Sequence, residues 1–534
     1  MNQGMQLLDY IVFLLYFAIV AGIGYSIYRK RTKTASTTDY FLAEGSLTWW
    51  AIGASLIASN ISAEQFIGMS GSGFAMGLAI ASYEWMAAVT LLVVAIFFLP
   101  IYLKNKIYTM PQFLSDRFDG RVSTVMAVFW LLVYVFVNLS SILYLGALTL
   151  ERMVGLNFMV CVIGLAVFAI VITLGGMRVI GYTDVFQVLV LIIGGLITAY
   201  LALDLVAQNF GSSGFFAGLS ILHKEAPGHF DMILSPDNKF YGELPGLTVL
   251  VGGMWIANLS YWGSNQYITQ RALGAKDLDT AQKGLLFAGF LKLLMPLIVV
   301  IPGIAAYVLH NVDPAFKASM TVNGVIKPDS AYSTLLDLLP TGLKGIAFAA
   351  LVAAIVASLA GKANSIATIF TLDIFKKFMD KEASEDKLVR IGQFSILASF
   401  AIAIAVAPAL TSLDQGFQYI QEYTGFITPG VCAIFLLGLF WKKATPTAAL
   451  SAALLTIPLS ALMKSFTPSV PFLDRMGYVF LILVAIMVVI SLLKPESSKK
   501  EIAVDRSLFV TSFGFRIGAL LIMGVIAALY IAYW

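Results

Sequence analysis

The stretch that decides the fold is ASNISAEQFIGMSGSG, residues 58–73. It belongs to an apolar run that begins near residue 47, but amides, a carboxylate, hydroxyls and glycines interrupt that run. A second apolar run, 246–270, is interrupted in the same way by NLSYWGSNQ at 258–266. Unwound backbone at membrane depth is tolerated only where it lines a cavity or is buried in protein. The two stretches predict a pair of broken membrane helices around a polar site near the bilayer midplane.

The composition agrees with a chain that lies mostly in lipid. Hydrophobic residues make up 59% of it and charged residues 12%, whereas soluble domains carry about 25% charge. This balance excludes an ordinary globular enzyme. A span needs roughly 20 apolar residues, and such runs lie near 8–28, 47–73, 77–103, 121–150, 156–175, 182–206, 246–270, 279–309, 343–376, 390–411, 415–440, 444–464, 472–493 and 511–533. The sequence predicts an all-α integral membrane protein with about fourteen transmembrane helices.

Basic residues indicate the orientation of these helices. They gather in the odd-numbered connectors: Arg29 to Lys33, Lys104, Lys106, Arg117, Arg121, Arg271, Lys276, Lys283, Lys376, Lys377, Lys381, Lys387, Arg390, Lys442, Lys443, Lys494, Lys499 and Lys500. Lys and Arg are enriched on the cytoplasmic side of membrane proteins. We therefore expect both termini to be extracytoplasmic.

Ionisable residues inside predicted spans include Glu84, Asp184, Lys292 and Lys362. A charge at the centre of a membrane helix costs at least about 2.5–3.5 kcal/mol, so each implies a partner or a polar cavity. For Glu84 and Lys292 we favour a cavity. For Asp184, near the cytoplasmic end of its span, a structural ion pair competes with that interpretation. In the eleventh span, Gln421 lies among aromatic residues, and amides beside rings suit a sugar, although aromatic stripes more often serve packing.

Several separated blocks resemble the sodium/solute symporter family, above all its sodium/galactose and sodium/glucose branches. They are residues 54–86, 258–270, 365–373 (SIATIFTLD), 417–425 (FQYIQEYTG) and 438–443 (GLFWKK). The resemblance covers nearly the whole chain. It implies a LeuT-type core of five plus five helices in an inverted repeat at 41–443, with an additional helix and basic loop at 1–40 and three additional helices at 444–534.

The resemblance also implies a function and a site. The function is uptake of a galactose- or glucose-like monosaccharide by alternating access, coupled to sodium, in the bacterial cytoplasmic (inner) membrane. The matching sugar-binding positions are Gln65, Glu84, Asn258, Lys292 and Gln421. The inner gate falls on Asn60 and Tyr261, and the outer gate on Met69, Tyr83 and Phe417. The sodium ligands fall on the carbonyls of Ala58, Ile61 and Ala354 and on the Ser358 hydroxyl.

This chain departs from the family pattern at the ion site. Ala357 stands where the family has a second serine ligand, and Lys362 stands where the relatives are apolar. Asp184 matches an acidic residue on the sodium exit route. One hypothesis is that Lys362 reaches towards Ser358 and Asp184 and takes over part of the ion's role; the other is that it extends to the cytoplasmic interface. At the sugar site, Ala87, Ser260 and Ser264 also differ from the galactose branch.

Other classes of function stay open at this stage. The altered ion site leaves open a channel or facilitator without coupling, although the broken helices and gates fit that class less well. It also leaves open a sugar carrier of the same fold that is sodium-independent, either proton-coupled or a uniporter. A relative that carries proline, pantothenate or sialic acid would share the fold. Nothing in the sequence resembles a nucleophile–base pair or a metal motif, so an enzyme is remote. The expected partners are the monosaccharide, sodium and the lipid bilayer, with no nucleic acid and no obligatory protein partner.

Overall fold

The computed structural model describes residues 5–29, 41, 47–322, 324–412, 416–495, 502 and 504–534. The first half of this region contains α1 (Leu7–Arg29), α3 (Trp49–Asn60), η2 (Glu64–Met69), α4 (Ser70–Met76), η3 (Gly77–Ala81), α5 (Ser82–Val93), η4 (Val94–Phe98), α6 (Leu99–Lys104), α7 (Met110–Arg117), α8 (Gly120–Leu132), η5 (Val133–Leu139), α9 (Ser140–Val154), α10 (Phe158–Thr173), α11 (Met177–Asn209), α12 (Phe215–Glu225), η6 (Pro227–His229), α13 (Leu247–Val251), α14 (Gly253–Ser264) and α15 (Gln266–Leu273).

The second half contains α16 (Leu278–Val312), α17 (Pro314–Met320), η7 (Pro328–Ser330), α18 (Ala331–Asp337), α19 (Leu343–Thr368), η8 (Ile369–Met379), α20 (Glu385–Val406), η9 (Ala407–Ser412), α21 (Gly416–Thr424), α22 (Thr428–Phe440), α23 (Pro446–Phe466), α24 (Phe472–Leu493), η10 (Arg506–Phe509) and α25 (Phe513–Ala532). Within the described residues, the strands are limited to one hairpin of β1 (Thr321–Val322) and β2 (Val325–Ile326). The prediction of an all-α architecture is confirmed.

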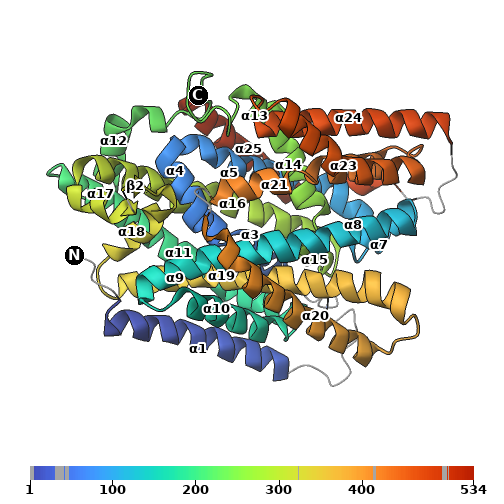
Figure 1. Ribbon diagram of the computed structural model, residues 1–534, viewed down its shortest axis with the longest axis horizontal. Helices are drawn as coiled ribbons and strands as arrows, with labels where there is room; N and C mark the ends of the chain where they lie inside the picture. The colour runs from blue at the N-terminus through green and yellow to red at the C-terminus, as the bar shows by residue number, and fades with distance from the viewer. Residues whose placement is uncertain are drawn as a thin grey trace.

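The predicted spans coincide with single helices or with runs of consecutive helices. Ten stretches of the described chain are long and apolar enough to cross a membrane, and Phe158–Thr173 and Thr428–Phe440 are shorter apolar helices. One of the ten, Glu64–Lys104, contains the chain reversal at Gly77, whose φ of 73° favours glycine. The protein is therefore a multi-pass membrane protein, with its helices aligned roughly along the long axis of the bundle (Figure 1).

Two of the predicted spans are broken, as the interrupted stretches predict. The second span unwinds at 61–62, where Ile61 is extended between α3 and η2. The seventh span is divided at the extended residue Asn265, between α14 and α15. Sequence reasoning missed a further break at Gly252, which separates α13 from α14. Residues 258–264, predicted to be part of the interruption, are helical because only Asn265 leaves helical geometry there.

The two chain ends lie on the same face of the bundle. Near the start of α1, the Asp9 carboxylate accepts hydrogen bonds from Gly342 N (2.7 Å) and Gly345 N (2.9 Å), and near the other end Met232 N donates to Tyr533 O (2.8 Å). Both contacts involve even-numbered connectors. This agrees with an even number of spans and with termini on one side of the membrane.

Two basic residues counted towards the cytoplasmic connectors are buried instead. Arg117 donates to the carbonyls of Gly438, Trp441, Lys442 and Ala444 and so ties α7 to the end of α22. Arg271 is 1% exposed because α15 continues to Leu273 and carries it into the core. The lysines of the odd-numbered connectors remain the basis for the orientation.

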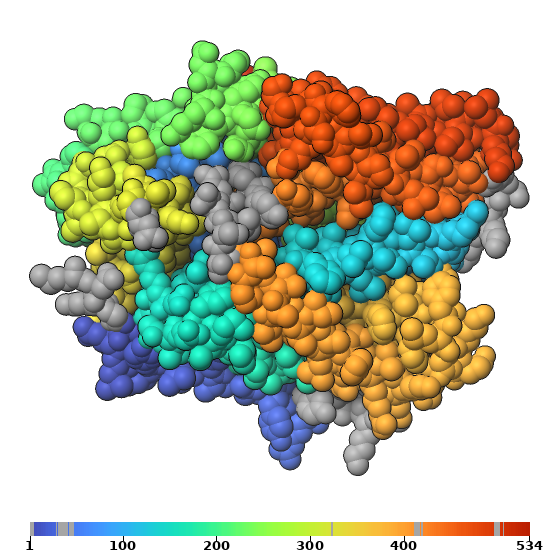
Figure 2. All heavy atoms as spheres, viewed as in Figure 1, coloured from blue at the N-terminus to red at the C-terminus, as the bar shows by residue number. Residues whose placement is uncertain are grey.

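Helix α1 and the pair α23–α24, which are predicted to be additions to the core, lie at opposite edges of the bundle. Figure 2 shows α1 in blue at one edge and the pair α23–α24 in orange-red at the other. The broken spans lie between these edges, where α3 packs against α16, α11 and α19. The fold thus encloses the two breaks within protein, where unwound backbone can be satisfied.

Candidate functional site

A polar cavity of about 130 Å³ lies between the two broken spans. Side chains from η2, α5, α14, α16 and α21 converge on it. All of the residues predicted to bind sugar or to form the gates line this cavity: Gln65, Glu84, Asn258, Lys292, Gln421, Asn60, Tyr261, Met69, Tyr83 and Phe417. Ala87 and Ser260 line it as well, whereas Ser264 donates to the Ser260 carbonyl (2.8 Å) within α14. The structure brings these separated blocks of sequence together in one place.

A buried ion pair forms one wall of the cavity. The Lys292 ammonium lies 2.5 Å from the Glu84 carboxylate and also donates to the Asn60 side-chain carbonyl. It sits 5.2 Å from the centre of the Trp262 ring, close enough for a cation–π contact. Both alternatives considered for Glu84 and Lys292 therefore hold, because the two residues pair with each other and face the cavity.

Gln65 connects this cavity to the break in the second span. Its side-chain carbonyl accepts hydrogen bonds from the Ser62 backbone N–H (2.9 Å) and the Ser62 hydroxyl (3.0 Å). In a continuous helix the Ser62 N–H would donate to the Ala58 carbonyl. Because the Gln65 side chain accepts from this N–H, the Ala58 carbonyl loses its helical partner. The Gln65 backbone N–H donates to Ser62 O and not to Ile61 O, so the Ile61 carbonyl loses its helical partner as well.

The predicted outer gate is closed over the cavity. The rings of Tyr83 and Phe417 meet edge to face with centroids 5.5 Å apart. Phe417 packs against Gly68 so closely that a Cβ at Gly68 would lie 2.7 Å from the Phe417 Cβ. Met69 and Phe417 are 1% and 4% exposed. A side chain at Gly68 would therefore hold the α21 segment away from η2.

The predicted inner gate separates two cavities. The Tyr261 hydroxyl accepts a hydrogen bond from the Asn60 amide (2.9 Å) and also bonds to the Tyr267 hydroxyl. A second cavity, of about 80 Å³, lies beyond Tyr261 and is lined by Tyr134, Asn265, Tyr267 and Lys362 among others. Glu64, Tyr261 and Gln421 line both cavities. Movement of the Tyr261 ring would join them.

The helices that carry three of the expected sodium ligands, α3 and α19, pack against each other near Ser358. The Ser358 hydroxyl donates to the Ser59 carbonyl (2.6 Å), next to the freed carbonyl of Ala58. Ala354 lies one turn earlier on α19, on the same face as Ser358. Ala357 contributes no hydroxyl, so the set offers oxygen atoms from three carbonyls and one side chain. Oxygen ligands of this kind suit a hard cation.

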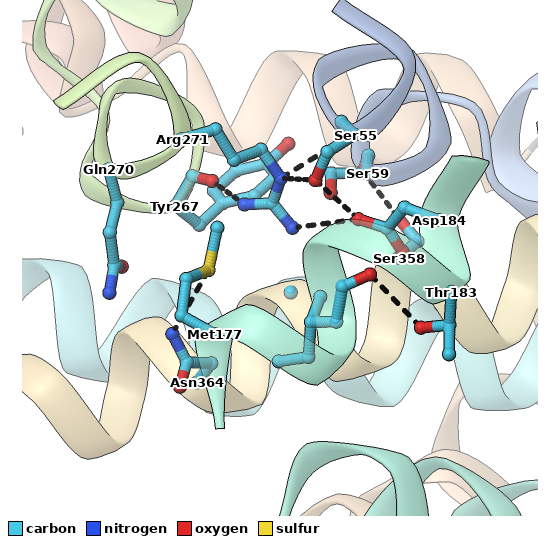
Figure 3. A network of polar contacts seen from close by, with 12 residues as sticks. Ser55, Ser59, Met177, Thr183, Asp184, Tyr267, Gln270, Arg271, Ser358 and Asn364 are labelled. Carbon is cyan, nitrogen blue, oxygen red and sulfur yellow. Dashed lines mark hydrogen bonds and ion pairs between the residues drawn. The ribbon is translucent and has the colours of Figure 1, made fainter. Parts of the chain in front are cut away.

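Asp184 does not pair with Lys362, which corrects one part of the Lys362 hypothesis. Its carboxylate accepts a hydrogen bond from the Ser55 hydroxyl (2.5 Å) and lies 3.8 Å from the Arg271 guanidinium (Figure 3). Arg271 also donates to the Ser55 carbonyl (3.0 Å) and to the Tyr267 carbonyl. The structural ion pair is therefore the correct interpretation of Asp184. Lys362 lies instead within 3.5 Å of the Ser358 hydroxyl.

Four residues of this region were not singled out from the sequence. Arg271 was assigned to a connector; Trp262 and Glu64 lie within the quoted stretches, but no role was assigned to them. Gly361 makes room for Arg271, since a Cβ there would lie close to the Arg271 guanidinium and 3.0 Å from the Ser59 hydroxyl. A usable signal for Arg271 is its place one residue beyond the block 258–270, which resembles the family.

Comparison with known proteins gives consistent matches over most of the chain. The profile of the Sodium:solute symporter family matches residues 40–456. The sodium/glucose cotransporter of Vibrio parahaemolyticus is 48% identical, and the alignment covers 100% of this chain and 99% of that protein. The human sodium/myo-inositol cotransporter 2 is 35% identical over 83% of this chain and 67% of its own length.

Two solved structures share the fold. A Na⁺-coupled sialic acid symporter in a substrate-bound outward-open state matches with a TM-score of 0.79 and 20% identity, over 93% of this chain and 100% of that one. A nucleobase-cation-symport-1 family transporter in a closed conformation matches with a TM-score of 0.52 and 16% identity, over 88% of this chain and 98% of that one. Both are LeuT-type transporters, so the predicted architecture is confirmed.

Proposed function

Because this chain belongs to the sodium:solute symporter family, we propose that it carries a galactose- or glucose-like monosaccharide into the cell by sodium-coupled symport. It is a transporter and not an enzyme. The observation that carries the proposal is one cavity that is lined by five amides, two carboxylates and an ammonium beside aromatic rings. Sugar hydroxyls need donors and acceptors together, and the C–H faces of a sugar ring pack on aromatic rings.

In the proposed cycle, sugar and sodium enter from the outside while Met69, Tyr83 and Phe417 are apart. Gln65, Glu84, Asn258, Lys292 and Gln421 then hold the sugar hydroxyls, and the outer residues close over them. Displacement of Tyr261 from Asn60 opens the route through the second cavity to the cytoplasm. The similarity to a Vibrio protein supports a bacterial cytoplasmic membrane as the location.

Coupling is proposed to pass through the break after α3. The carbonyls of Ala58, Ile61 and Ala354 and the Ser358 hydroxyl would hold sodium, which is cargo of the cycle. Gln65 keeps the Ser62 N–H occupied and the Ala58 carbonyl free, and it also faces the sugar cavity. One side chain thus supports both sites, so that each ligand favours the geometry that the other needs.

The ten-helix core is proposed to extend over residues 41–443, with 1–40 and 444–534 as additions to it. The contacts of α3 and α11 with α16 and α19 support this division because they bring helices of the two expected repeats together. Part of the first addition, residues 30–40, lies outside the described residues.

A panel of solutes tests the substrate class. We expect purified protein to bind galactose or glucose and to show no binding of proline or sialate. Binding can be followed by tryptophan fluorescence, because Trp262 adjoins Lys292 in the cavity. Gln421→Ala should weaken sugar binding by about tenfold or more, the loss of one to two hydrogen bonds. Glu422→Gln is the matched control, since Glu422 points away to Arg475 (2.6 Å) and Lys464 (3.2 Å). Binding of proline or sialate without any hexose would reject the sugar assignment.

A further inference from the structure

Lys362 is a buried cation whose bonding is incomplete. Its side chain is 2% exposed, and within the described part of the chain its contacts are the Ser358 hydroxyl at 3.5 Å and the face of the Tyr267 ring at 5.0 Å. The other buried lysines among the described residues have closer polar partners. The Lys292 ammonium lies 2.5 Å from the Glu84 carboxylate, and the Lys344 ammonium donates to the Asp337 carbonyl at 2.8 Å. An ammonium group has three donors, so the single long contact of Lys362 leaves it free to take another position.

The second cavity offers that other position. Lys362 and Glu64 both line this space of about 80 Å³. Glu64 attracts the Lys362 ammonium and Arg271 repels it, while Asp184 is already held by Ser55 and Arg271. The Glu64 carboxylate has only one hydrogen-bond donor in the described residues, the Ser141 hydroxyl at 2.9 Å. The flexible four-carbon stem of a lysine can turn its ammonium from Ser358 towards this carboxylate.

The Ser358 hydroxyl is the only side-chain oxygen in the expected sodium set, because Ala357 replaces its neighbour. A sodium ion and an ammonium group would compete for it, since each needs its oxygen lone pairs. Like charges at contact distance also repel strongly in a partly buried site. The lysine position at Ser358 and the bound sodium therefore exclude each other.

We propose that Lys362 is a tethered cation that exchanges with sodium during each transport cycle, an inference that rests on the proposed function. In the sodium-free carrier its ammonium bonds to Ser358. When sodium binds, the ammonium turns into the second cavity towards Glu64. The lysine thereby weakens sodium binding, assists sodium release to the cytoplasm and stabilises the empty carrier during its return.

The exchange reaches the inner gate through Tyr267. The ring under the Lys362 ammonium belongs to the tyrosine whose hydroxyl bonds to Tyr261, and the two tyrosine rings meet edge to face at 5.6 Å. Departure of the ammonium from this ring removes a contact that holds Tyr267 in place. Occupancy of the ion site and the position of the gate are in this way linked by two adjacent contacts.

A sodium titration of sugar uptake in proteoliposomes tests the exchange. Lys362→Met should lower the sodium concentration for half-maximal uptake by about tenfold, because one competing charge is removed. Lys362→Arg keeps the charge and should stay close to the unaltered protein. The matched control is Lys344→Met, a buried lysine at the other end of α19, which should leave the sodium titration unchanged.

Glu64→Gln provides a second, independent variant. Without the carboxylate the ammonium should stay at Ser358, so the half-maximal sodium concentration should rise, and Lys362→Met in the same chain should cancel that rise. An unchanged sodium titration in folded Lys362→Met protein would reject the exchange while leaving the symport proposal intact. Sodium-independent uptake by the unaltered protein would reject both sodium coupling and the exchange, whether or not Lys362→Met then acquires sodium dependence.

Discussion

Lys292→Met is expected to abolish sugar uptake and to reduce the yield of folded protein. The substitution leaves the Glu84 carboxylate buried without its ammonium partner at 2.5 Å. Removing one member of a buried ion pair typically costs about 3–5 kcal/mol, which is a large fraction of the stability of a protein. It also removes donors that the proposed sugar site needs. Uptake of labelled galactose and size-exclusion profiles of detergent-solubilised protein measure the two effects.

The double variant Glu84→Gln with Lys292→Met separates structure from ligand binding. With both charges gone, no uncompensated charge remains in the membrane, so the folded yield should recover substantially. Sugar uptake should stay absent, because neither the carboxylate nor the ammonium is available to the sugar. Recovery of uptake in the double variant would mean that this pair holds helices α5 and α16 together and does not contact the sugar.

Gln65→Leu is expected to weaken both sugar and sodium binding, although Gln65 is not a proposed sodium ligand. The variant loses the amide that faces the cavity, and it leaves the buried Ser62 N–H without its acceptor at 2.9 Å. An unsatisfied buried donor costs about 1–3 kcal/mol. The Ser62 N–H can regain a partner by bonding to the Ala58 carbonyl, which would then be less available to sodium. Since tenfold in affinity is about 1.4 kcal/mol, we expect a loss of about ten- to hundredfold for each ligand.

Sodium affinity without sugar is the decisive readout for this variant. It can be measured as the sodium-dependent rise in thermal stability. Asn258→Ala is the matched control, because Asn258 lines the cavity but bonds to Met254 O (3.1 Å) and the Trp262 indole (3.2 Å) within α14. It should reduce sugar binding alone. Normal sodium stabilisation in Gln65→Leu would show that the break does not depend on this side chain.

The architecture and the site cavity were largely predictable because both rest on strong local signals. Long apolar runs predict spans in lipid, and polar residues within them predict breaks, as at 61–62 in the second span. An unpaired charge inside a membrane is energetically costly, so Glu84 and Lys292 are expected to pair with each other. Gln421 follows Glu84 by more than three hundred residues and Lys292 by more than one hundred, and its place beside them came from the resemblance and not from any local pattern.

The arrangement around Asp184 could not be predicted from local patterns. An arginine just beyond an apolar segment is normally predicted to lie at the cytoplasmic surface. Arg271 is buried instead because α15 continues to Leu273 and places it in the core. The space for it depends on the absence of a side chain at Gly361, a long-range fit between α15 and α19. With Arg271 beside Asp184, Lys362 is left near Ser358 and the second cavity. Such pairings are set by tertiary packing, which periodicity does not encode.

The central claim, sodium-coupled sugar symport, is tested most directly by uptake into proteoliposomes under an inward sodium gradient. We expect labelled galactose or glucose to accumulate transiently above its external concentration, and to reach only equilibrium when sodium is replaced by choline or when the gradient is collapsed. Equal accumulation in choline, or equilibration at the same rate with and without the gradient, would contradict sodium coupling.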